Sequence, residues 1–561
     1  MTEKEALELN SITTHELLLS KMKLKKALLE NNIVLACDVE NKLENHAYYM
    51  TDSERTTHMH IMGRSGGGKS RLIEFMVRQD IQRGRGVCVI DPHGELYWNI
   101  VRYIIQECDN DIKERVYLLN PSQDDYLIQF NPFFIDDLEG LEAHTDKILG
   151  AIEKIWKKDL TENPGIYRYL TMIIQTSIIQ RLGVMEILES LFSHNKRKKI
   201  FSDLQKNKHN ISLEVFEFWR EIVANPNKSE MILSGAHTRL RLLLSSPAIQ
   251  MMTLKGTSLD ITQVINNNGI ILVNLAKTKT FSLKHQKIVG TLLLNELVNF
   301  FDNRGESFKY AGDPNIKTNW SPFFLYVDEF QRYITSDLGE ILAGGRKFGF
   351  HMIMANQTFS QLDEKLKEEI SNIASAKAYF AVKDINIAME IWKQAGTYSP
   401  KIKEVVTRLQ VLDDGYDYEP TTTSSTNHLG QVSESKSERV LKRNKIVETK
   451  ENKYYSEQET ALIEGKKIQQ LKPRHFLFTS DNMPEGIILK TEWCFDTQCF
   501  TEEINDFHKY LAEKHPGLYY SVTELKKELE LIKNPFSEKY IEDQKAFEKD
   551  LENEEADEDY N

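Results

Sequence analysis

One glycine-rich stretch constrains this chain more than any other, the segment GRSGGGKS. The fixed positions of the phosphate-loop pattern G-x-x-x-x-G-K-[ST] are occupied by Gly63, Gly68, Lys69 and Ser70. Apolar residues precede the segment at 59–62, and a helical apolar pattern begins after it at Leu72. The motif therefore has the strand-loop-helix setting that it requires, which predicts an α/β fold.

Such a loop binds phosphate chiefly through its backbone. Glycines let successive N–H groups face one anion at the N-terminus of the following helix. The residues expected to line the nucleotide are Gly63, Arg64, Ser65, Gly66, Gly67, Gly68, Lys69 and Ser70. In this pattern the lysine reaches the β- and γ-phosphates, and the hydroxyl after it binds Mg²⁺. The motif thus predicts ATP and Mg²⁺ as cofactors.

A second motif, FFLYVDEF at 323–330, reads as a buried strand that ends in two acids. This is the Walker B arrangement, in which a strand end delivers carboxylates beside the phosphate loop. We expect Asp328 to hold Mg²⁺ and Glu329 to act on the attacking water as a general base. A strand ending in acids is common by itself, but its combination with the loop predicts hydrolysis.

Two further residues are candidates for catalysis. The strand predicted at 350–355 is followed by Gln357, which is placed to sense the γ-phosphate or to position water. Upstream, Arg346 lies on the connection between strands. Two interpretations of Arg346 are open: an arginine finger for a neighbouring subunit's nucleotide, or a surface cation at a helix end.

Polar residues also follow the strand predicted within GVCVIDPHGEL, at 86–96. Ligands of open α/β sheets bind at such carboxyl ends. Asp91 and His93 have two interpretations of equal weight. They either form a turn that caps the following helix or act near the nucleotide.

The strand pattern is absent between about 141 and 254, where apolar residues recur at helical spacing, and it returns at 269–275. The sequence therefore predicts an α/β core interrupted by an all-helical insertion. Within the insertion, the basic run 195–199 is interpreted as a solvated loop in preference to a contact with a nucleic-acid backbone.

The chain is expected to have six parts. They are an N-terminal element at 1–50, helical at 17–31 and then extended; the first part of the core at 51–140; the helical insertion at 141–255; the second part of the core at 256–395; a flexible segment with a return strand at 396–480; and C-terminal helices with an acidic tail at 481–561. Flexibility is expected because 415–455 is rich in polar residues with little apolar periodicity.

Composition narrows the function classes. A net charge of −13 argues against a protein that coats nucleic acid over its whole surface, although a locally basic pore is compatible with it. The five cysteines are scattered and form no C-x-x-C pair, which predicts reduced thiols and no zinc site. No window of about 18 apolar residues occurs, so the sequence predicts no membrane insertion and a cytoplasmic location.

Taken in order, GRSGGGKS, VIDPHGEL, FNPFF, the helical insertion, LYVDEF and GGRKFGFHMIMANQ resemble the HerA/FtsK superfamily of RecA-like motor ATPases. The resemblance is greatest to type IV coupling proteins of the TraD/TraG kind. It implies a RecA-like core with a mostly parallel sheet and helices on both faces. It also implies a ring, usually a homo-hexamer, with ATP at subunit interfaces and DNA, single- or double-stranded, in the central channel.

The chain departs from coupling proteins in one respect, since their N-terminal membrane helices are not readable here. Two partner arrangements follow from the resemblance: a conjugation motor that meets a relaxase or a secretion channel at the inner face of the membrane, or a HerA-like motor that works with a nuclease in DNA repair or phage defence. A hypothesis of another class is an ATP-switched assembly protein that moves no polymer. A small-molecule kinase would explain neither the second motif nor the length.

Overall fold

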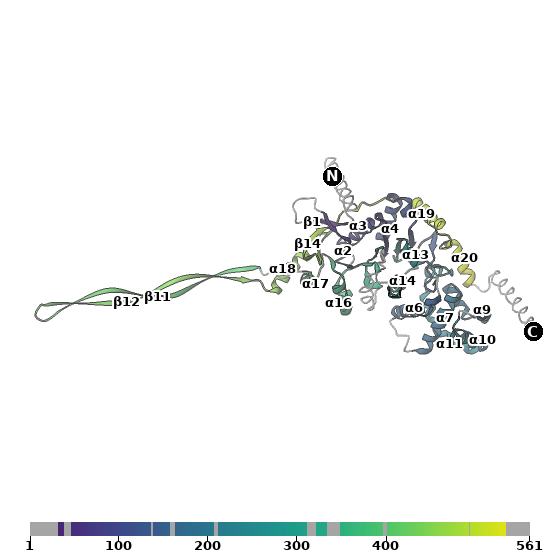
Figure 1. The fold of residues 1–561 in the computed structure, drawn as a ribbon, viewed down its shortest axis with the longest axis horizontal. Helices are drawn as coiled ribbons and strands as arrows, with labels where there is room; N and C mark the ends of the chain where they lie inside the picture. The colour runs from purple at the N-terminus through teal and green to yellow at the C-terminus, as the bar shows by residue number, and fades with distance from the viewer. Residues whose placement is uncertain are drawn as a thin grey trace, which may run out of the picture. The chain divides into compact units, whose positions relative to one another are not determined.

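The computed structural model describes most of the chain, shown in Figure 1. The described ranges are 32–38, 47–55, 57–135, 138–156, 163–206, 211–310, 321–333, 348–395, 401–492 and 494–533. They divide into two compact units, one made of 384–469 and the other of the remaining described residues. The helix predicted at 17–31, the connection that holds Arg346 and the acidic tail lie outside the described residues.

The larger unit is built on an eleven-stranded sheet. Its spatial order is β2 (Ala47–Met50), β1 (Ile33–Asp38), β14 (Met483–Lys490), β13 (His475–Ser480), β10 (Ala376–Phe380), β3 (Met59–Met62), β9 (Phe350–Asn356), β8 (Phe323–Val327), β4 (Gly86–Asp91), β7 (Ile270–Asn274) and β5 (Val116–Leu119). The strands from β10 to β5 are all parallel. Every residue of β3, β4, β7, β8 and β9 is buried, so both faces of this part of the sheet are covered.

Helices of the core follow the parallel strands. In Figure 1, α3 (Lys69–Gln82) and α4 (Glu95–Glu107) lie side by side. The other α-helices that the structure describes in the larger unit outside the insertion are α2 (Asp52–Arg55), α5 (Asn110–Lys113), α14 (Leu283–Tyr310), α16 (Glu364–Ile373), α19 (Thr501–Lys514) and α20 (Val522–Lys533). A small second sheet pairs β6 (Tyr126–Ile128) with β15 (Tyr519–Ser521). The predicted α/β core with a mostly parallel sheet is confirmed, β13 lies where the return strand is expected, and α19 and α20 lie where the C-terminal helices are expected.

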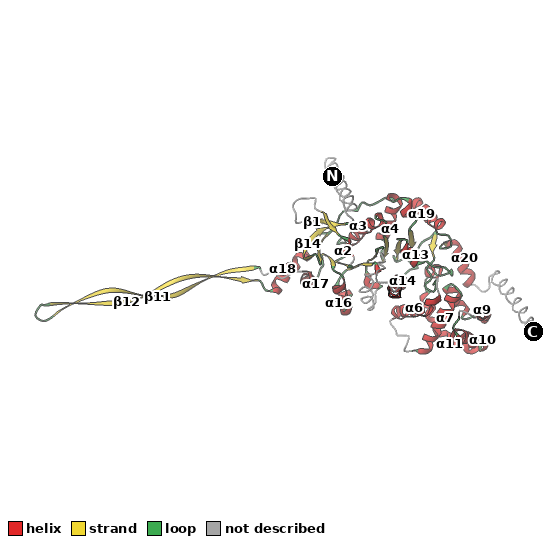
Figure 2. Cartoon of the chain, viewed as in Figure 1, coloured by secondary structure: helices red, strands yellow, loops and turns green. Residues whose placement is uncertain are grey.

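Among the described residues between β6 and β7, the regular secondary structure is all helical, and loops join the red helices of Figure 2. The helices are α6 (Leu141–Trp156), α7 (Pro164–Ile179), α8 (Val184–Ser190), α9 (His194–Lys206), α10 (Leu213–Ala224), α11 (Pro226–Leu243), α12 (Pro247–Met252) and α13 (Ile261–Asn266). The predicted helical insertion is confirmed.

The basic run 195–199 is not a loop, and that prediction was wrong. It lies within α9, whose buried face includes Arg197, Ile200 and Leu204. These three residues follow the i, i+3, i+7 spacing of one helix face. The number of charged residues suggested a loop, but the run belongs to an amphipathic helix. The aliphatic part of the Arg197 side chain lies on the buried face of α9 with Ile200 and Leu204.

The smaller unit contains α17 (Ile385–Ala395), α18 (Glu457–Gln469) and a long antiparallel hairpin of β11 (Ile402–Thr426) and β12 (Val432–Tyr454). The segment 415–455, which the sequence predicts to be flexible, therefore has regular structure as two paired strands. Paired strands can hold polar residues through contacts across the ladder, as where the Thr421 hydroxyl donates to the Ser437 carbonyl oxygen at 2.9 Å. Low apolar content indicates solvent exposure. A disordered segment and an exposed hairpin are both exposed to solvent, so composition does not distinguish them.

A buried ion pair ties α2 to α3 beneath the sheet. The Arg55 guanidinium donates two hydrogen bonds of 2.7 Å to the Asp80 carboxylate, which also accepts one from the Tyr326 hydroxyl. Burial alone would raise the pKa of Asp80, but Arg55 and Arg85 lower it below its usual value. The charge of Asp80 is thus kept inside the protein by paired, hydrogen-bonded cations.

No helix in the described ranges has both the length and the apolar character needed to cross a bilayer.

Candidate nucleotide site

The phosphate loop joins β3 to α3, and its glycines are required by close packing. Gly63 has φ 152°, and a Cβ there would lie 2.5 Å from the Phe380 Cβ. Gly68, directly before α3, has φ 115°, and a Cβ there would lie 3.2 Å from the Arg474 Cα. Both positions combine left-handed backbone with a neighbour that leaves no room for a side chain, so only glycine fits.

Backbone hydrogen bonds hold the loop to three other segments. The Gly63 N–H donates to the Asn356 carbonyl at 3.3 Å, and the Arg64 N–H donates to the Ala381 carbonyl at 3.0 Å. The Gly67 carbonyl accepts from the Arg474 N–H at 2.8 Å. The loop is therefore held in shape by the ends of β9 and β10 and by the turn before β13.

Lys69 is buried at the base of the loop. Its amino group donates to the Gly63 carbonyl at 2.7 Å. Burial lowers the pKa of Lys69, while the carboxylates of Asp328 and Glu329 oppose that shift. The lysine charge is thus held between the loop and the acids at the end of β8, as the motif predicts.

The acids predicted at the end of β8 meet the loop. The Ser70 hydroxyl lies 3.5 Å from Asp328 Oδ2, and the Asp328 side chain is buried. Burial, with Asp91 next in effect, raises the pKa of Asp328 to about 6, against the opposing charge of Lys69. A hydroxyl and a carboxylate oxygen in this position suit Mg²⁺, which prefers oxygen ligands. The positive charge of the ion would compensate the negative charge of the buried carboxylate.

Glu329 is held by two amides. Gln357 Nε2 donates to Glu329 Oε1 at 2.7 Å, and Gln331 Nε2 donates to Oε2 at 2.6 Å. Glu329 is 3% exposed and has φ 49°, a left-handed backbone conformation that is costly for a residue with a Cβ. Strained, buried and bonded at both oxygens, this carboxylate has one defined position.

The place of Gln357 follows from the strand order. β9 lies between β3 and β8, so its end stands between the phosphate loop and the acids. Asn356 reinforces the link, since its carbonyl holds Gly63 while its side chain bonds His60 Nε2 at 2.9 Å. Burial lowers the pKa of His60 to about 4, so this imidazole is neutral. The sequence pattern singled out Gln357 but missed Gln331 and the role of Asn356, whose only signal is proximity to the motifs.

Asp91 serves as a helix cap. Its carboxylate accepts from the His93 N–H at 2.8 Å, just before α4, and from the Tyr97 N–H at 2.9 Å, in the first turn of α4. The capping interpretation is confirmed. Asp91 also contributes to the raised pKa of Asp328, whereas His93 opposes it. A role for these two residues toward a nucleotide stays a prediction.

Arg346 belongs to the stretch 334–347, outside the described residues. Both of its interpretations, the arginine finger and the surface cation, stay predictions.

A cavity of about 530 Å³ opens beside the first turn of α3. It is lined by Arg71, Glu95, Asn99, Arg102 and the segment 496–500. Arg71 pairs with Asp496 at 2.7 Å, and Phe500 is 79% exposed. Since Arg71 directly follows Ser70, this cavity adjoins the phosphate loop.

Two family models match the chain. The model described as Helicase HerA, central domain matches residues 49–297, and the model described as TraM recognition site of TraD and TraG matches residues 322–473. The first includes the phosphate loop and the helical insertion. The second includes Asp328, Glu329, Gln357 and the hairpin. No match was found among curated proteins.

Solved structures with a similar chain path include conjugative coupling proteins. The bacterial conjugative coupling protein TrwBdeltaN70 with sulphate has a TM-score of 0.48 at 12% identity, over 83% of this chain and 95% of that one. TrwB with the ATP analogue ADPNP has 0.45 at 13% identity, over 81% and 89%. VirB4 of Thermoanaerobacter pseudethanolicus has 0.43 at 12% identity, over 85% and 98%.

Proposed function

Since the chain belongs to the HerA/FtsK superfamily of RecA-like ATPases, we propose that it hydrolyses Mg²⁺-ATP and uses the energy to move DNA. The observation that carries the hydrolytic part is the carboxylate of Glu329, held by two amides at 2.6 and 2.7 Å next to the phosphate loop. A loop that only bound nucleotide would have no use for a positioned base.

The chemistry assigned to each residue follows from its place. The loop N–H groups and Lys69 bind the phosphates, while Ser70 and Asp328 would hold Mg²⁺, which supplies positive charge to the phosphate oxygens. Glu329 takes a proton from water as the water oxygen bonds to the γ-phosphorus and the bond to the leaving ADP oxygen breaks. The products are ADP and inorganic phosphate.

Gln357 has a second task in this proposal. Its amide now donates to Glu329, and an ATP γ-phosphate in the loop would offer it a more strongly charged acceptor. Exchange of one acceptor for the other would free one oxygen of Glu329 for water. Because Asn356 ties the same strand end to Gly63, the shape of the loop and the position of Gln357 are coupled.

The cavity beside α3 is the proposed place of the nucleotide base. It adjoins Ser70, its wall carries the exposed ring of Phe500, and Arg71 and Arg102 offer flat cationic surfaces. Aromatic rings and guanidinium groups both stack on planar heterocycles.

The DNA part of the proposal rests on the two family matches. Within it, both partner arrangements stand: conjugative transfer with a relaxase or secretion channel, and a HerA-like motor with a nuclease. A homo-hexameric ring is part of the same proposal, with Arg346 as the candidate residue that acts across its interface.

The test is the rate of ATP hydrolysis by the full chain with and without single- and double-stranded DNA, at several salt concentrations. We expect DNA to raise the rate, with a stimulation that falls as salt rises, because contacts to DNA phosphates release counterions. The Glu329→Gln variant is the control for contaminating ATPases. A rate of ATP hydrolysis that neither form of DNA changes at any salt concentration would reject DNA translocation and favour the ATP-switched assembly protein.

A further inference from the structure

The hairpin of β11 and β12 has no third strand beside it in the part of the chain that the structure describes. Its strands are 25 and 23 residues long, so each has a long edge that faces no other strand. An isolated two-stranded ribbon is at best marginally stable in water, and open edges accept further strands. The hairpin therefore has the form of a sheet that lacks its neighbours.

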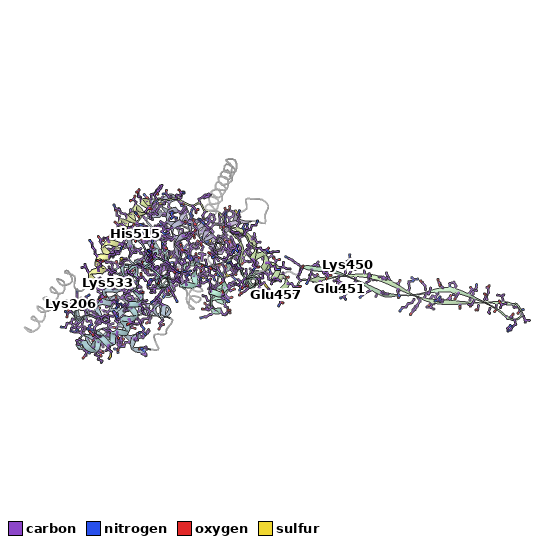
Figure 3. All side chains as sticks on the ribbon, turned by 180° about the vertical axis from the view of Figure 1, so that it is seen from behind. Lys206, Lys450, Glu451, Glu457, His515 and Lys533 are labelled. Atoms are coloured by element: carbon purple, nitrogen blue, oxygen red, sulfur yellow. The ribbon has the colours of Figure 1, made fainter. Side chains whose placement is uncertain are left out.

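One face of this ribbon, called the apolar face below, carries large apolar side chains among polar ones such as Lys442 and Glu448. In the strand register Val411 lies opposite Ile446, and Tyr418 lies opposite Val440. The residues of this apolar face, all 54–64% exposed, are Leu409, Val411, Tyr416, Tyr418, Val440 and Ile446. In Figure 3 the side chains stand out along the ribbon, Lys450 and Glu451 being labelled near its base. Large apolar side chains gathered in this way on an exposed face indicate a missing contact.

The opposite face carries hydroxyl groups toward the tip. Thr421 pairs with Ser437, Thr423 with Ser435, and Ser425 with Ser433. These small, uncharged residues offer positions where a substitution disturbs neither the apolar face nor the charges.

At the same position along the hairpin, the two strands carry opposite charges. Residues 413–419 of β11 contain four acids and no base, namely Asp413, Asp414, Asp417 and Glu419. Residues 439–445 of β12 contain four bases and no acid, namely Arg439, Lys442, Arg443 and Lys445. Within the hairpin the two stretches face each other, as Glu419 opposite Arg439 shows. The ribbon thus has an acidic strand on one side and a basic strand on the other.

This charge pattern determines which strand of a second copy can pair with each edge of the hairpin. A strand in a sheet has two neighbours, and here the inner neighbour is already of opposite charge. A second copy that paired β11 with β11, or β12 with β12, would place like charges across the new ladder, which is destabilising. Pairing of β12 in one copy with β11 in another places opposite charges across it.

We propose that hairpins of separate copies pair edge to edge, with the basic strand β12 of one copy antiparallel to the acidic strand β11 of the next. Each added copy again presents one basic and one acidic edge, so the contact is head-to-tail and is satisfied throughout only when the copies close into a ring. The apolar faces of the paired hairpins then lie on one side of a continuous sheet. The proposal goes beyond the nucleotide site and does not depend on ATP hydrolysis.

Disulfide cross-linking between two chains tests the pairing. One full-length chain carries Thr423→Cys, the other carries Ser435→Cys and a tag that changes its mass, and both carry Cys37→Ser and Cys499→Ser. If β12 of one copy pairs with β11 of another, the Cα atoms of directly opposite residues lie about 4.5–5.5 Å apart, which is within disulfide range. Because the register between copies is not set by the hairpin itself, all nine combinations of cysteines are compared. The positions are Thr421, Thr423 and Ser425 on β11 and Ser433, Ser435 and Ser437 on β12.

We expect mixed disulfides between β11 and β12 in at least one register, and few disulfides in either chain alone. Cross-links only between like strands, or none in any combination, would overturn the proposal. Co-sedimentation of the uncross-linked chain with anionic phospholipid vesicles, without mixed disulfides, would also overturn it by assigning the apolar face to lipid.

A charge-swapped chain tests the selection by charge. It exchanges acids and bases between the strands while keeping opposite charges across the hairpin, so the fold of the hairpin itself is conserved. The substitutions are Asp414→Lys, Asp417→Arg, Glu419→Lys, Arg439→Glu, Lys442→Glu and Arg443→Asp. Swapped chains should cross-link with one another as natural chains do, and at least tenfold less with natural chains. Equal cross-linking of swapped and natural chains would overturn the role of charge.

ATP hydrolysis measured on the same chains separates this proposal from the function. An active ATPase without mixed disulfides would reject the pairing alone. Mixed disulfides in a chain without ATPase activity would reject the function alone.

Discussion

The nucleotide site and the hairpin place charge in opposite ways. In the core, Asp80, Asp328 and Glu329 are at most 5% exposed, and each is held by named partners. In the hairpin, Arg443 and Asp417 pair across the ladder while both side chains are 53% exposed. A buried charge must be compensated in one geometry, whereas an exposed one is screened by water and replaceable. Charge in the core is therefore fixed in place by its partners, whereas charge on the ribbon is open to a neighbouring chain.

The largest expected effect is on catalysis. Glu329→Gln should lower the rate of ATP hydrolysis about 10²- to 10⁴-fold, because it removes the proton acceptor while keeping the shape of the side chain. Nucleotide affinity, measured by titration calorimetry, should change little. Glu530→Gln, at an exposed position of α20, is the matched control. Full turnover in Glu329→Gln would remove this residue from the mechanism.

Removal of one carboxylate charge from each region compares their stabilities directly. Asp80→Asn leaves the buried Arg55 guanidinium without its counter-ion and should lower the free energy of unfolding by about 3–5 kcal/mol. Asp417→Asn breaks an ion pair on the exposed ribbon and should leave the melting temperature unchanged. Both are measured by thermal and urea unfolding. Equal effects in the two variants would erase the contrast between core and ribbon.

Removing each of the two amides that bond Glu329 distinguishes a restraint on this carboxylate from a direct role in catalysis. Gln357→Ala should lower the turnover number about 100-fold if its amide moves to the γ-phosphate, the size of effect seen when one donor to a developing charge is removed. Gln331→Ala, which removes only the other bond to Glu329, should have a smaller effect. A rise in turnover in Gln357→Ala would instead show that Gln357 merely restrains the base.

Acid should remove the advantage of the buried ion pair. The pKa of Asp80 is lowered in the folded protein, so its stabilising charge is fully present above the unfolded pKa of about 3.9 and is lost as pH falls through the lower folded value. The difference in unfolding free energy between the natural chain and Asp80→Asn should therefore shrink below about pH 4. A difference that stays constant through this range would mean that Asp80 does not titrate with folding.

The smallest expected effect concerns the base of the nucleotide. Phe500→Ala should raise the KM for ATP about 2- to 10-fold with the turnover number unchanged, because stacking contributes to binding and not to the reaction. The control is inorganic tripolyphosphate, which has no base and whose affinity should be unaffected. Equal losses for both ligands would place the base elsewhere.

Several parts of the site could be predicted because their residues are read from local pattern. The phosphate loop, Asp328 and Glu329 each lie in a short motif whose strand or helix is set by neighbours in sequence. Gln331 and Asn356 could not be assigned roles this way, since one contact depends on the left-handed turn at Glu329 and the other on β9 lying next to β3. Local pattern also failed for 195–199 and 415–455, where charge and polarity indicate exposure but do not reveal a helix or a hairpin.

The sequence by itself determined that residues 63–70 form a phosphate-loop pattern between a strand and a helix and that two acids follow a strand end, because glycine, lysine and carboxylate chemistry is tied to local spacing. It also determined the helical insertion, through its 3.6-residue periodicity. Only the tertiary structure decided that β9 lies between β3 and β8, which places Gln357 against Glu329. Strand order and the register between β11 and β12 arise from contacts between residues distant in sequence, and no local pattern encodes them.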